Sequence, residues 1–310
     1  MKNYFSPIIA FSLMLVSALP AAFAQQIPSC YENKSIQFPP QNPTLSAALE
    51  SRANKRAVVI LVDETSVLPY QVQSIAKRIN DNLYKSLGSS ADHEGMFYQV
   101  LKFSTFTSKN FASTLINGTL ESGVTLNPNA QNTLRTSELA SLNAMLKNLN
   151  SCLLQQAKYG LDKSNEAILT TMKNGASNIP NSDILVAMQQ AGTVFKGRKE
   201  EENILIVISD MMEHSAYTSF YTKGGDLKDI NPKAEIENLQ KKSFSADLTG
   251  VIVWILGGGY FPNPGTTQAA SARNPQQVAL LEEFWNDFFK QSKAVLKEFG
   301  KPELIGALPP

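Results

Sequence analysis

Three short runs of apolar residues constrain the fold of this chain more than any other feature. They cover residues 57–62, 203–209 and 250–259, and each is followed, directly or after a loop, by apolar residues that recur every three or four positions. Such runs are typical of strands buried on both faces, and the recurring pattern is typical of amphipathic helices. The alternation predicts an α/β fold, with a doubly wound, mostly parallel sheet flanked by helices in three layers.

The same periodicities predict the remaining elements. Further strands are expected at residues 96–103 and, with a more polar pattern, at 111–120. Helices are expected at the following positions: 43–54, 72–87, 133–173, from 182 onward, 233–244 and around 278–289. Gly160 is expected to divide the stretch 133–173 into two helices, the first of which carries Cys152.

The N-terminal residues are typical of a secretory leader. Lys2 gives a positive start, residues 8–19 are apolar but too few to span a bilayer, and an Ala-Phe-Ala cleavage site ends at Ala24. The prediction is a signal peptide over residues 1–24 and a mature protein in the periplasm or outside the cell. The mature chain is then expected to have three parts: an N-terminal arm with a short helix (25–55), one domain with insertions (56–300) and a flexible tail (301–310).

The charge balance argues against two classes of partner. The chain has 28 basic and 27 acidic residues, and one of the basic residues, Lys2, lies in the leader, so the mature chain has equal numbers. Binding to nucleic acid or to an anionic membrane needs a basic excess. No later segment is long and apolar enough to cross a membrane. A protein is therefore the expected partner.

Two cysteines remain in the mature chain, Cys30 and Cys152. In an oxidising compartment a lone pair of cysteines is expected to form a disulfide, which here would join the N-terminal arm to the middle of the chain. Two separate buried thiols are the alternative.

Acidic residues follow two of the apolar runs. Asp63 comes directly after the first run, with Thr65 and Ser66 close behind, and Asp210 follows the second run. Because parallel strands end at the same edge of a sheet, these side chains are expected to converge there. Carboxylate and hydroxyl oxygens suit a hard cation such as Mg²⁺ or Mn²⁺.

These segments resemble the von Willebrand factor A (integrin I-like) family. In that family a metal-ion-dependent adhesion site combines an Asp-x-Ser-x-Ser run after the first strand, a Thr that opens a helix, and an Asp after a later strand. Asp63 and Thr65 match the start of the run, Ser182 stands where the Thr belongs, and Asp210 matches the last Asp. Val67 departs from the pattern, because the third place of the run needs a hydroxyl.

The resemblance implies a doubly wound sheet and a non-enzymatic, protein-binding module. Its implied metal ligands are Asp63, Thr65, Ser182 and Asp210, holding Mg²⁺ or Mn²⁺. A second interpretation is that the site is degenerate, with Asp63 accepting hydrogen bonds from Thr65 and from the backbone of the next turn.

A phosphatase is the enzymatic alternative. The Asp-x-Thr-x-Val run also resembles the first motif of haloacid-dehalogenase-like phosphatases, in which Asp63 would be the nucleophile and Asp210 with Glu213 would hold Mg²⁺. A structural component of an envelope assembly, with a vestigial crevice, is a third possibility.

The polar, aromatic insertion at 211–232 follows Asp210 and is expected to rise above the strand ends. Its aromatic side chains either contact a partner or anchor the loop to the domain. The predicted partner-binding set consists of Ser66, Glu213, His214, Tyr217, Phe220 and Tyr221.

Overall fold

The computed structural model describes residues 24–65, 72–87, 94–104, 112–174, 182–222, 227–259 and 274–301. Nearly all of the predicted signal peptide (1–24) lies outside these residues, as does all but the first residue of the predicted tail (301–310), and so do Ser66 and Val67. The division into arm, domain and tail stays a prediction.

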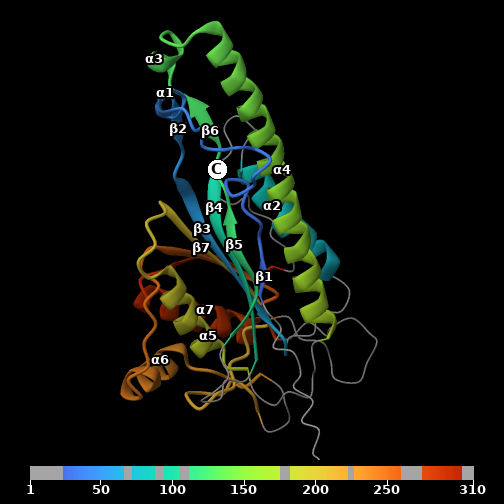
Figure 1. Cartoon of the computed structure of the whole chain (residues 1–310). Helices are drawn as coiled ribbons and strands as arrows, with labels where there is room; N and C mark the ends of the chain where they lie inside the picture. Colours follow the sequence, from blue (N-terminus) through green and yellow to red (C-terminus); the bar gives the residue numbers. More distant parts are fainter. Residues whose placement is uncertain are drawn as a thin grey trace, which may run out of the picture.

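A mostly parallel sheet forms the centre of the described structure (Figure 1). Among the described strands of this sheet, β4 and β5 pair antiparallel, and all other neighbouring strands pair in parallel. The strands follow one another across the sheet in this order: β1 (Gln25–Gln26), β5 (Ser113–Leu120), β4 (Gly95–Phe103), β3 (Asn54–Asp63), β7 (Glu202–Ile208), β8 (Val251–Leu256) and β9 (Val295–Lys301). The predicted fold class, a doubly wound α/β sheet, is confirmed.

Helices cover both faces of this sheet. The described helices are α1 (Pro43–Ala47), α2 (Val72–Ser86), α3 (Pro128–Gln131), α4 (Thr136–Lys173), α5 (Ile184–Phe195), α6 (Pro232–Lys241) and α7 (Pro275–Gln291). On β3, Val58 and Ile60 share a core with α2 and α4, whereas Val59 and Leu61 share a core with α5 and α7. This alternation explains why the strand is apolar at every position, since both faces of the sheet are buried.

The long helical stretch is one helix, so the predicted division at Gly160 is wrong. Gly160 is buried in the middle of α4, where a Cβ atom would lie 2.8 Å from Cδ2 of Leu120 and 3.2 Å from Cδ1 of Ile27. The residue therefore lets the helix approach β5 and the N-terminal arm closely, and it does not end the helix.

Part of the chain extends beyond the amino ends of the central strands (Figure 1). There β2 (Leu49–Ser51) pairs antiparallel with β6 (Val124–Leu126), beside α1, α3 and the first turns of α4. These two strands pair with each other beyond the start of β4. At that start Gly95 lies close to the chain that leads into β6, since a Cβ on it would lie 2.6 Å from the backbone nitrogen of Ser122. We call these elements the distal projection. It was not predicted, and its strand β2 occupies the second half of the predicted helix 43–54.

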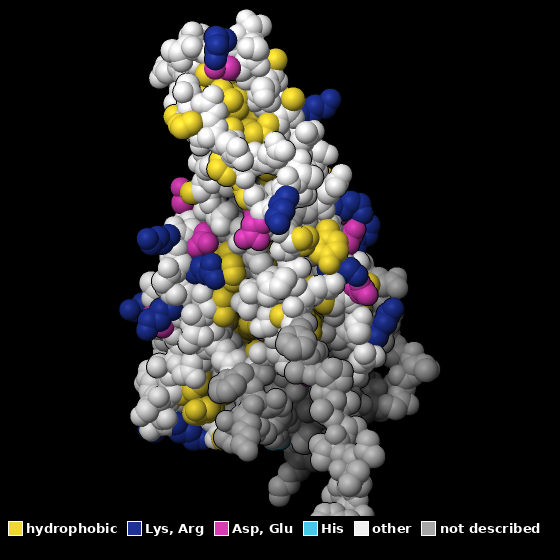
Figure 2. All heavy atoms as spheres, viewed as in Figure 1, with side chains coloured by type: hydrophobic (Ala, Val, Ile, Leu, Met, Phe, Trp, Pro, Cys, Tyr) yellow, Lys and Arg dark blue, Asp and Glu magenta, His cyan; other side chains and the backbone are white. Residues whose placement is uncertain are grey.

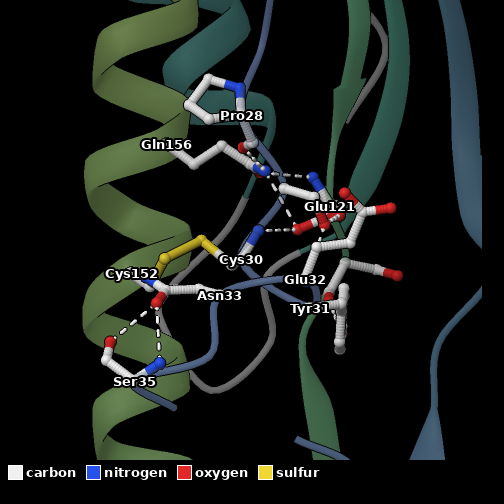
Figure 3. Close-up of a disulfide and its surroundings, with 11 residues drawn as sticks. Pro28, Cys30, Tyr31, Glu32, Asn33, Ser35, Glu121, Cys152 and Gln156 are labelled. Carbon is white, nitrogen blue, oxygen red and sulfur yellow. Dashed lines mark hydrogen bonds between the residues drawn. A yellow bond between two sulfur atoms is a disulfide. The ribbon is translucent and has the colours of Figure 1, made fainter. Parts of the chain in front are cut away.

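A disulfide fastens the N-terminal arm to α4 (Figure 3). Cys30 and Cys152 are bonded, with their Cα atoms 5.9 Å apart, as the sequence predicts. Beside them the backbone N–H of Cys30 donates to a carboxylate oxygen of Glu121 at 2.7 Å, and the Gln156 amide donates to that oxygen and to the carbonyl of Pro28. The arm is thus held by covalent and polar contacts together.

Within the described ranges, none of the helices combines the length and apolar character needed to cross a bilayer.

Candidate functional site

A buried carboxylate lies at the carboxyl end of the central strand. Asp63 is the last residue of β3 and is 1% exposed. Its Oδ1 accepts hydrogen bonds from the backbone N–H and the hydroxyl of Thr65, at 2.9 and 2.6 Å. Its Oδ2 accepts hydrogen bonds from the hydroxyls of Ser182 at 3.0 Å and Ser209 at 2.7 Å. Four donors from three segments therefore compensate for the burial of one charge.

The position of Ser182 is fixed by the loop that follows β7. Ser182 precedes α5 and is 3% exposed, and its carbonyl accepts a hydrogen bond from the backbone N–H of His214 at 3.0 Å. The next residue, Asp183, donates its backbone N–H to the carbonyl of Ser104, which follows β4. Backbone contacts to both neighbours thus place the Ser182 hydroxyl against Asp63.

Ser209 belongs to this network and was missed in the sequence. Val62 of β3 is the parallel partner of Ile208 of β7, so the next residues along the two strands, Asp63 and Ser209, lie side by side. Aligning the ends of the two apolar runs in register would have found this contact.

Asp210 lies one residue beyond the network, in a tight turn. Its Oδ1 accepts the backbone N–H of Met212 at 2.9 Å, and the Ser209 hydroxyl accepts that of Met211 at 2.9 Å. Met211 has a φ of 63°, a backbone conformation that residues other than glycine adopt uncommonly. These hydrogen bonds, together with burial of the Met211 side chain, hold the turn and leave the Asp210 carboxylate half-buried.

Burial raises the pKa of Asp63 above its ordinary value. Hydrogen bonds from Thr65, Ser209 and Ser182 to the ionised form oppose this shift. Burial therefore disfavours an isolated negative charge at this position, and a nearby positive charge would relieve it.

Glu213 faces the first turn of α5 and not a partner. It is fully buried, and its Oε2 accepts the backbone N–H of Leu185 at 2.9 Å. Burial is the main cause that raises its pKa to about 8, and the nearby Asp183 adds to the shift while the bond from Leu185 opposes it. The prediction that Glu213 contacts a partner is wrong, because its carboxylate lies inside the fold.

The aromatic residues of the insertion pack largely onto the domain. Phe220 is fully buried against Phe284, with ring centroids 4.8 Å apart, so the prediction that it faces a partner is wrong. Tyr217 is half-buried with its ring 4.6 Å from that of Phe244. For these two residues the anchoring alternative holds.

His214 and Tyr221 lie at the surface of the same insertion. The His214 ring is 5.6 Å from the ring of Tyr221, and its Nδ1 is 2.7 Å from the hydroxyl of Ser219. Both rings are half-buried. Their predicted role in partner contact stays a prediction.

The oxygen atoms at this site fit a hard cation. Among the described residues no group of three or more His, Cys, Asp or Glu side chains is placed to hold a metal ion. A cation here would therefore depend on hydroxyl oxygens as well as carboxylates. Thr65 and Ser182 each direct a proton to Asp63, which leaves oxygen lone pairs for a cation. The half-buried Asp210 directly follows Ser209 of the network, so its carboxylate is a further candidate ligand.

Comparison with known proteins found similar solved structures only. No protein-family model matches the sequence, and a search of curated protein sequences found no match. One similar structure is a von Willebrand factor type A protein from Catenulispora acidiphila, with 10% identity, a TM-score of 0.29, and coverage of 82% of this chain and 41% of that chain. Another is an aerotolerance-related membrane protein from Bacteroides fragilis, with 15% identity, a TM-score of 0.31, and coverage of 78% and 90%.

A third is the manganese-loaded TRAP protein of Plasmodium vivax, with 14% identity, a TM-score of 0.28, and coverage of 76% of each chain. At these identities and TM-scores the likeness transfers no function or ligand to this chain.

The arrangement of strands and strand-end residues identifies the fold. Asp63 ends the central parallel strand, Ser182 precedes the helix that packs beside it, and Asp210 follows the neighbouring strand. These are the three segments, in the same order, that the sequence resemblance requires. The chain therefore has a von Willebrand A-like fold.

Proposed function

We propose that this protein is an exported, non-enzymatic, protein-binding module whose contact face lies at the carboxyl ends of β3 and β7. The observation that carries this proposal is the convergence of hydroxyls from three chain segments on the buried carboxylate of Asp63. Such a network fixes Thr65, Ser182 and Ser209 at the carboxyl ends of the strands, and this edge of an α/β sheet is the usual position of a binding site.

A divalent cation, Mg²⁺ or Mn²⁺, is part of the proposal. The hydroxyls of Thr65 and Ser182 and the carboxylate of Asp210 would hold it, and Asp63 would orient the hydroxyls by accepting their protons. When bound, the cation would supply a positive charge for a partner carboxylate. The half-buried rings of His214 and Tyr221 would border that contact.

Burial of Asp63 supports a non-catalytic role. A carboxylate that attacks phosphorus must reach its substrate, whereas both oxygens of Asp63 accept two hydrogen bonds each and the residue is 1% exposed. Turnover of an aryl phosphate that depends on Asp63 would contradict this part of the proposal.

The disulfide supports export. A bond between Cys30 and Cys152 forms and persists in oxidising compartments and is rare in the cytosol. The leader predicted at residues 1–24 is consistent with delivery to the periplasm or the cell exterior.

Calorimetric titration with Mn²⁺ tests the cation. We expect heat of binding for the unchanged protein and for the control Asp229→Asn, which alters an exposed acid of the insertion. We expect Asp63→Ala to abolish the heat and Asp210→Asn to reduce it, with circular dichroism verifying that each variant is folded. Equal heats for the unchanged protein and a folded Asp63→Ala variant would remove the ion from the site.

Capture of periplasmic or extracellular proteins, with and without a chelator, tests the partner. A cation-dependent module should lose its partner when the chelator is added and when Asp210→Asn is introduced. Partner capture that is unchanged by the chelator and by Asp210→Asn would instead indicate a structural component with a vestigial crevice.

A further inference from the structure

The acidic side chains of this protein differ in their access to water. On the face shown in Figure 2, Asp and Glu side chains lie at the surface among Lys and Arg side chains. Glu213 is different, because it is 0% exposed although it belongs to the insertion that follows β7. Burial of a carboxyl group is costly unless hydrogen bonds compensate for it. The partners of Glu213 therefore indicate what its burial achieves.

Glu213 caps a helix that lacks a capping side chain of its own. The first backbone N–H groups of a helix have no partner within the helix, and the side chain just before it usually accepts one of them. In α5 the preceding residue is Asp183, and its side chain makes no capping hydrogen bond. Oε2 of Glu213 accepts the backbone N–H of Leu185 at 2.9 Å, and a bond from the backbone of Ile184 also favours the ionised carboxyl. A residue 28 positions after Leu185 thus performs the task of an N-cap.

The next residue of the insertion holds Ser182. His214 donates its backbone N–H to the carbonyl of Ser182 at 3.0 Å, and it also pairs with Ser219 further along the insertion. Ser182 is therefore held by the bond from His214 at its own carbonyl and by the bonds that Glu213 accepts two and three residues later. The Ser182 hydroxyl, which donates to Asp63 at 3.0 Å, is thus positioned through the insertion.

The insertion is fixed to the domain close to Glu213. Phe220 donates its backbone N–H to the carbonyl of Glu213 at 2.9 Å, and its ring is fully buried against Phe284. The carboxyl of Glu213 is therefore a fixed support for the start of α5. A second support is the bond from the N–H of Asp183 to the carbonyl of Ser104, so loss of the carboxyl should loosen this segment and not release it.

We propose that Glu213 is the positioning residue of the strand-end site: by capping α5 from the insertion, it holds the Ser182 hydroxyl where a cation needs it. This inference rests on the proposed function, in which Ser182 is a cation ligand. Glu213 acts through the backbone of α5 and touches no cation itself. Groups that orient metal ligands commonly affect metal affinity by about tenfold or more. The cation affinity would thus depend on the conformation of the insertion that borders the contact face.

Substitutions at Glu213 separate this role from a general effect on stability. Glu213→Met removes the acceptor and fills the buried space, Glu213→Ala removes it without adding bulk, and Glu213→Gln keeps an acceptor. Burial raises the pKa of Glu213 to about 8, so at pH 7 its carboxyl is mostly uncharged and Gln resembles it closely. The matched control is Asn274→Ala, which removes the side chain that caps α7 by accepting the N–H of Gln276 at 3.0 Å.

Two measurements at pH 7 test the proposal. Hydrogen exchange of the His214 amide reports on its bond to Ser182, and calorimetric titration with Mn²⁺ reports on the cation. We expect Glu213→Met and Glu213→Ala to raise the exchange rate and to weaken Mn²⁺ binding about tenfold. Glu213→Gln and Asn274→Ala should match the unchanged protein in both measurements, with circular dichroism verifying that each variant is folded.

Unchanged exchange at His214, or unchanged Mn²⁺ affinity, in a folded variant without the acceptor would overturn the proposal. So would a Glu213→Gln variant that is as impaired as Glu213→Met, because the acceptor would then not be what positions Ser182. Equal losses in Asn274→Ala would also overturn it, since they would follow from stability alone. If the unchanged protein releases no heat with Mn²⁺, the cation part of the proposed function fails, and the exchange rates alone decide whether Glu213 positions Ser182.

Discussion

At the scale of single residues, hydrogen bonds compensate for the burial of two acidic side chains. Asp63 and Glu213 are both at most 1% exposed, yet their environments differ. Asp63 lies at the carboxyl end of β3 and receives three hydroxyl protons and one backbone N–H. Glu213 lies against the first turn of α5, where the backbone N–H of Leu185 and the side chain of Ser215 are among its partners. The hydroxyls around Asp63 keep lone pairs for a cation while they donate, so Asp63 is the acid whose surroundings match the proposed ligand site.

The raised pKa of Glu213 predicts a pH dependence of stability. With a pKa of about 8 in the folded protein, this carboxyl stays protonated between pH 5 and 8 while it ionises in the unfolded chain. The unfolded chain then binds fewer protons, so stability falls as pH rises through this window. Glu213→Gln keeps an acceptor for Leu185 and removes the titration. The difference between its free energy of unfolding and that of the unchanged protein should shift in favour of the variant as the pH rises from 5 to 8, by an amount on the order of a few kcal/mol.

Urea unfolding of both proteins at several pH values measures this gain. Asp63 also has a raised pKa, but it is present in both proteins and its contribution cancels in the comparison. Parallel pH curves for Glu213→Gln and the unchanged protein would show that Glu213 does not titrate differently on folding.

At the scale of elements, close packing of helices depends on glycines within them. Gly192 lies in α5, the helix behind Ser182, where a Cβ would lie 2.4 Å from the backbone carbonyl oxygen of Asp247. A backbone atom cannot move aside as the end of a side chain can. The position of α5, and with it the Ser182 hydroxyl, therefore depends on this contact.

Gly192→Ala should destabilise the protein in spite of its better helix propensity. An Ala in place of Gly in an exposed helix interior stabilises by roughly 0.5–1 kcal/mol, but here the overlap should outweigh that gain and lower the free energy of unfolding by about 1–3 kcal/mol. The control is Thr193→Ala on the exposed face of α5, which should change stability by less than about 0.5 kcal/mol. Urea denaturation of the two variants measures these changes in the free energy of unfolding. A neutral or stabilising effect of Gly192→Ala would contradict the close approach of Gly192 to Asp247.

Elements with a continuous apolar run or a clear helical period could be predicted from the sequence, whereas the short strands β1, β2 and β6 and the edge strand β9 could not. The strands β3, β7 and β8 are apolar at nearly every position, and this pattern alone indicates a covered parallel sheet. The last strand, β9, was missed because it lies at the sheet edge and carries Lys297 and Glu298, which interrupt its apolar pattern. The break expected at Gly160 was wrong because contacts with Leu120 and Ile27 decide the role of that glycine.

The same limit applies to the candidate site. Asp63 and Thr65 could be predicted because they follow an apolar run, and Ser182 because it stands where the von Willebrand factor A resemblance places a helix-opening hydroxyl. Ser209 was missed because its contact with Asp63 depends on the register of two strands far apart in the sequence. Burial of Phe220 depends on the course of the insertion, which no periodicity in the sequence specifies.

At the scale of the whole molecule, the fold presents two separate ends (Figure 1). The strand-end network lies at the carboxyl ends of the parallel strands, and the distal projection extends beyond their amino ends. The single disulfide belongs to the second end, where it joins the arm to α4 beside Val124 of β6. Loss of this bond should therefore affect the projection and leave the strand-end network in place.

Replacement of both cysteines by alanine should lower the free energy of unfolding by about 2–5 kcal/mol, because the bond closes a loop with a sequence separation of 122. Hydrogen exchange should increase in residues 25–36 and in β6, and should stay slow around Asp63. Unfolding curves that are identical with and without the bond would contradict this account, as would faster exchange at the strand-end network.

The central claim is that Asp63 gathers Thr65, Ser182 and Ser209 into a site that holds a divalent cation near Asp210. The most direct measurement is the anomalous difference density of a crystal soaked in Mn²⁺. The account predicts a peak bordered by the hydroxyl oxygens of Thr65 and Ser182 and by the Asp210 carboxylate, and no peak in crystals of a folded Asp63→Ala variant. Absence of density at the strand ends in the unchanged protein would contradict it.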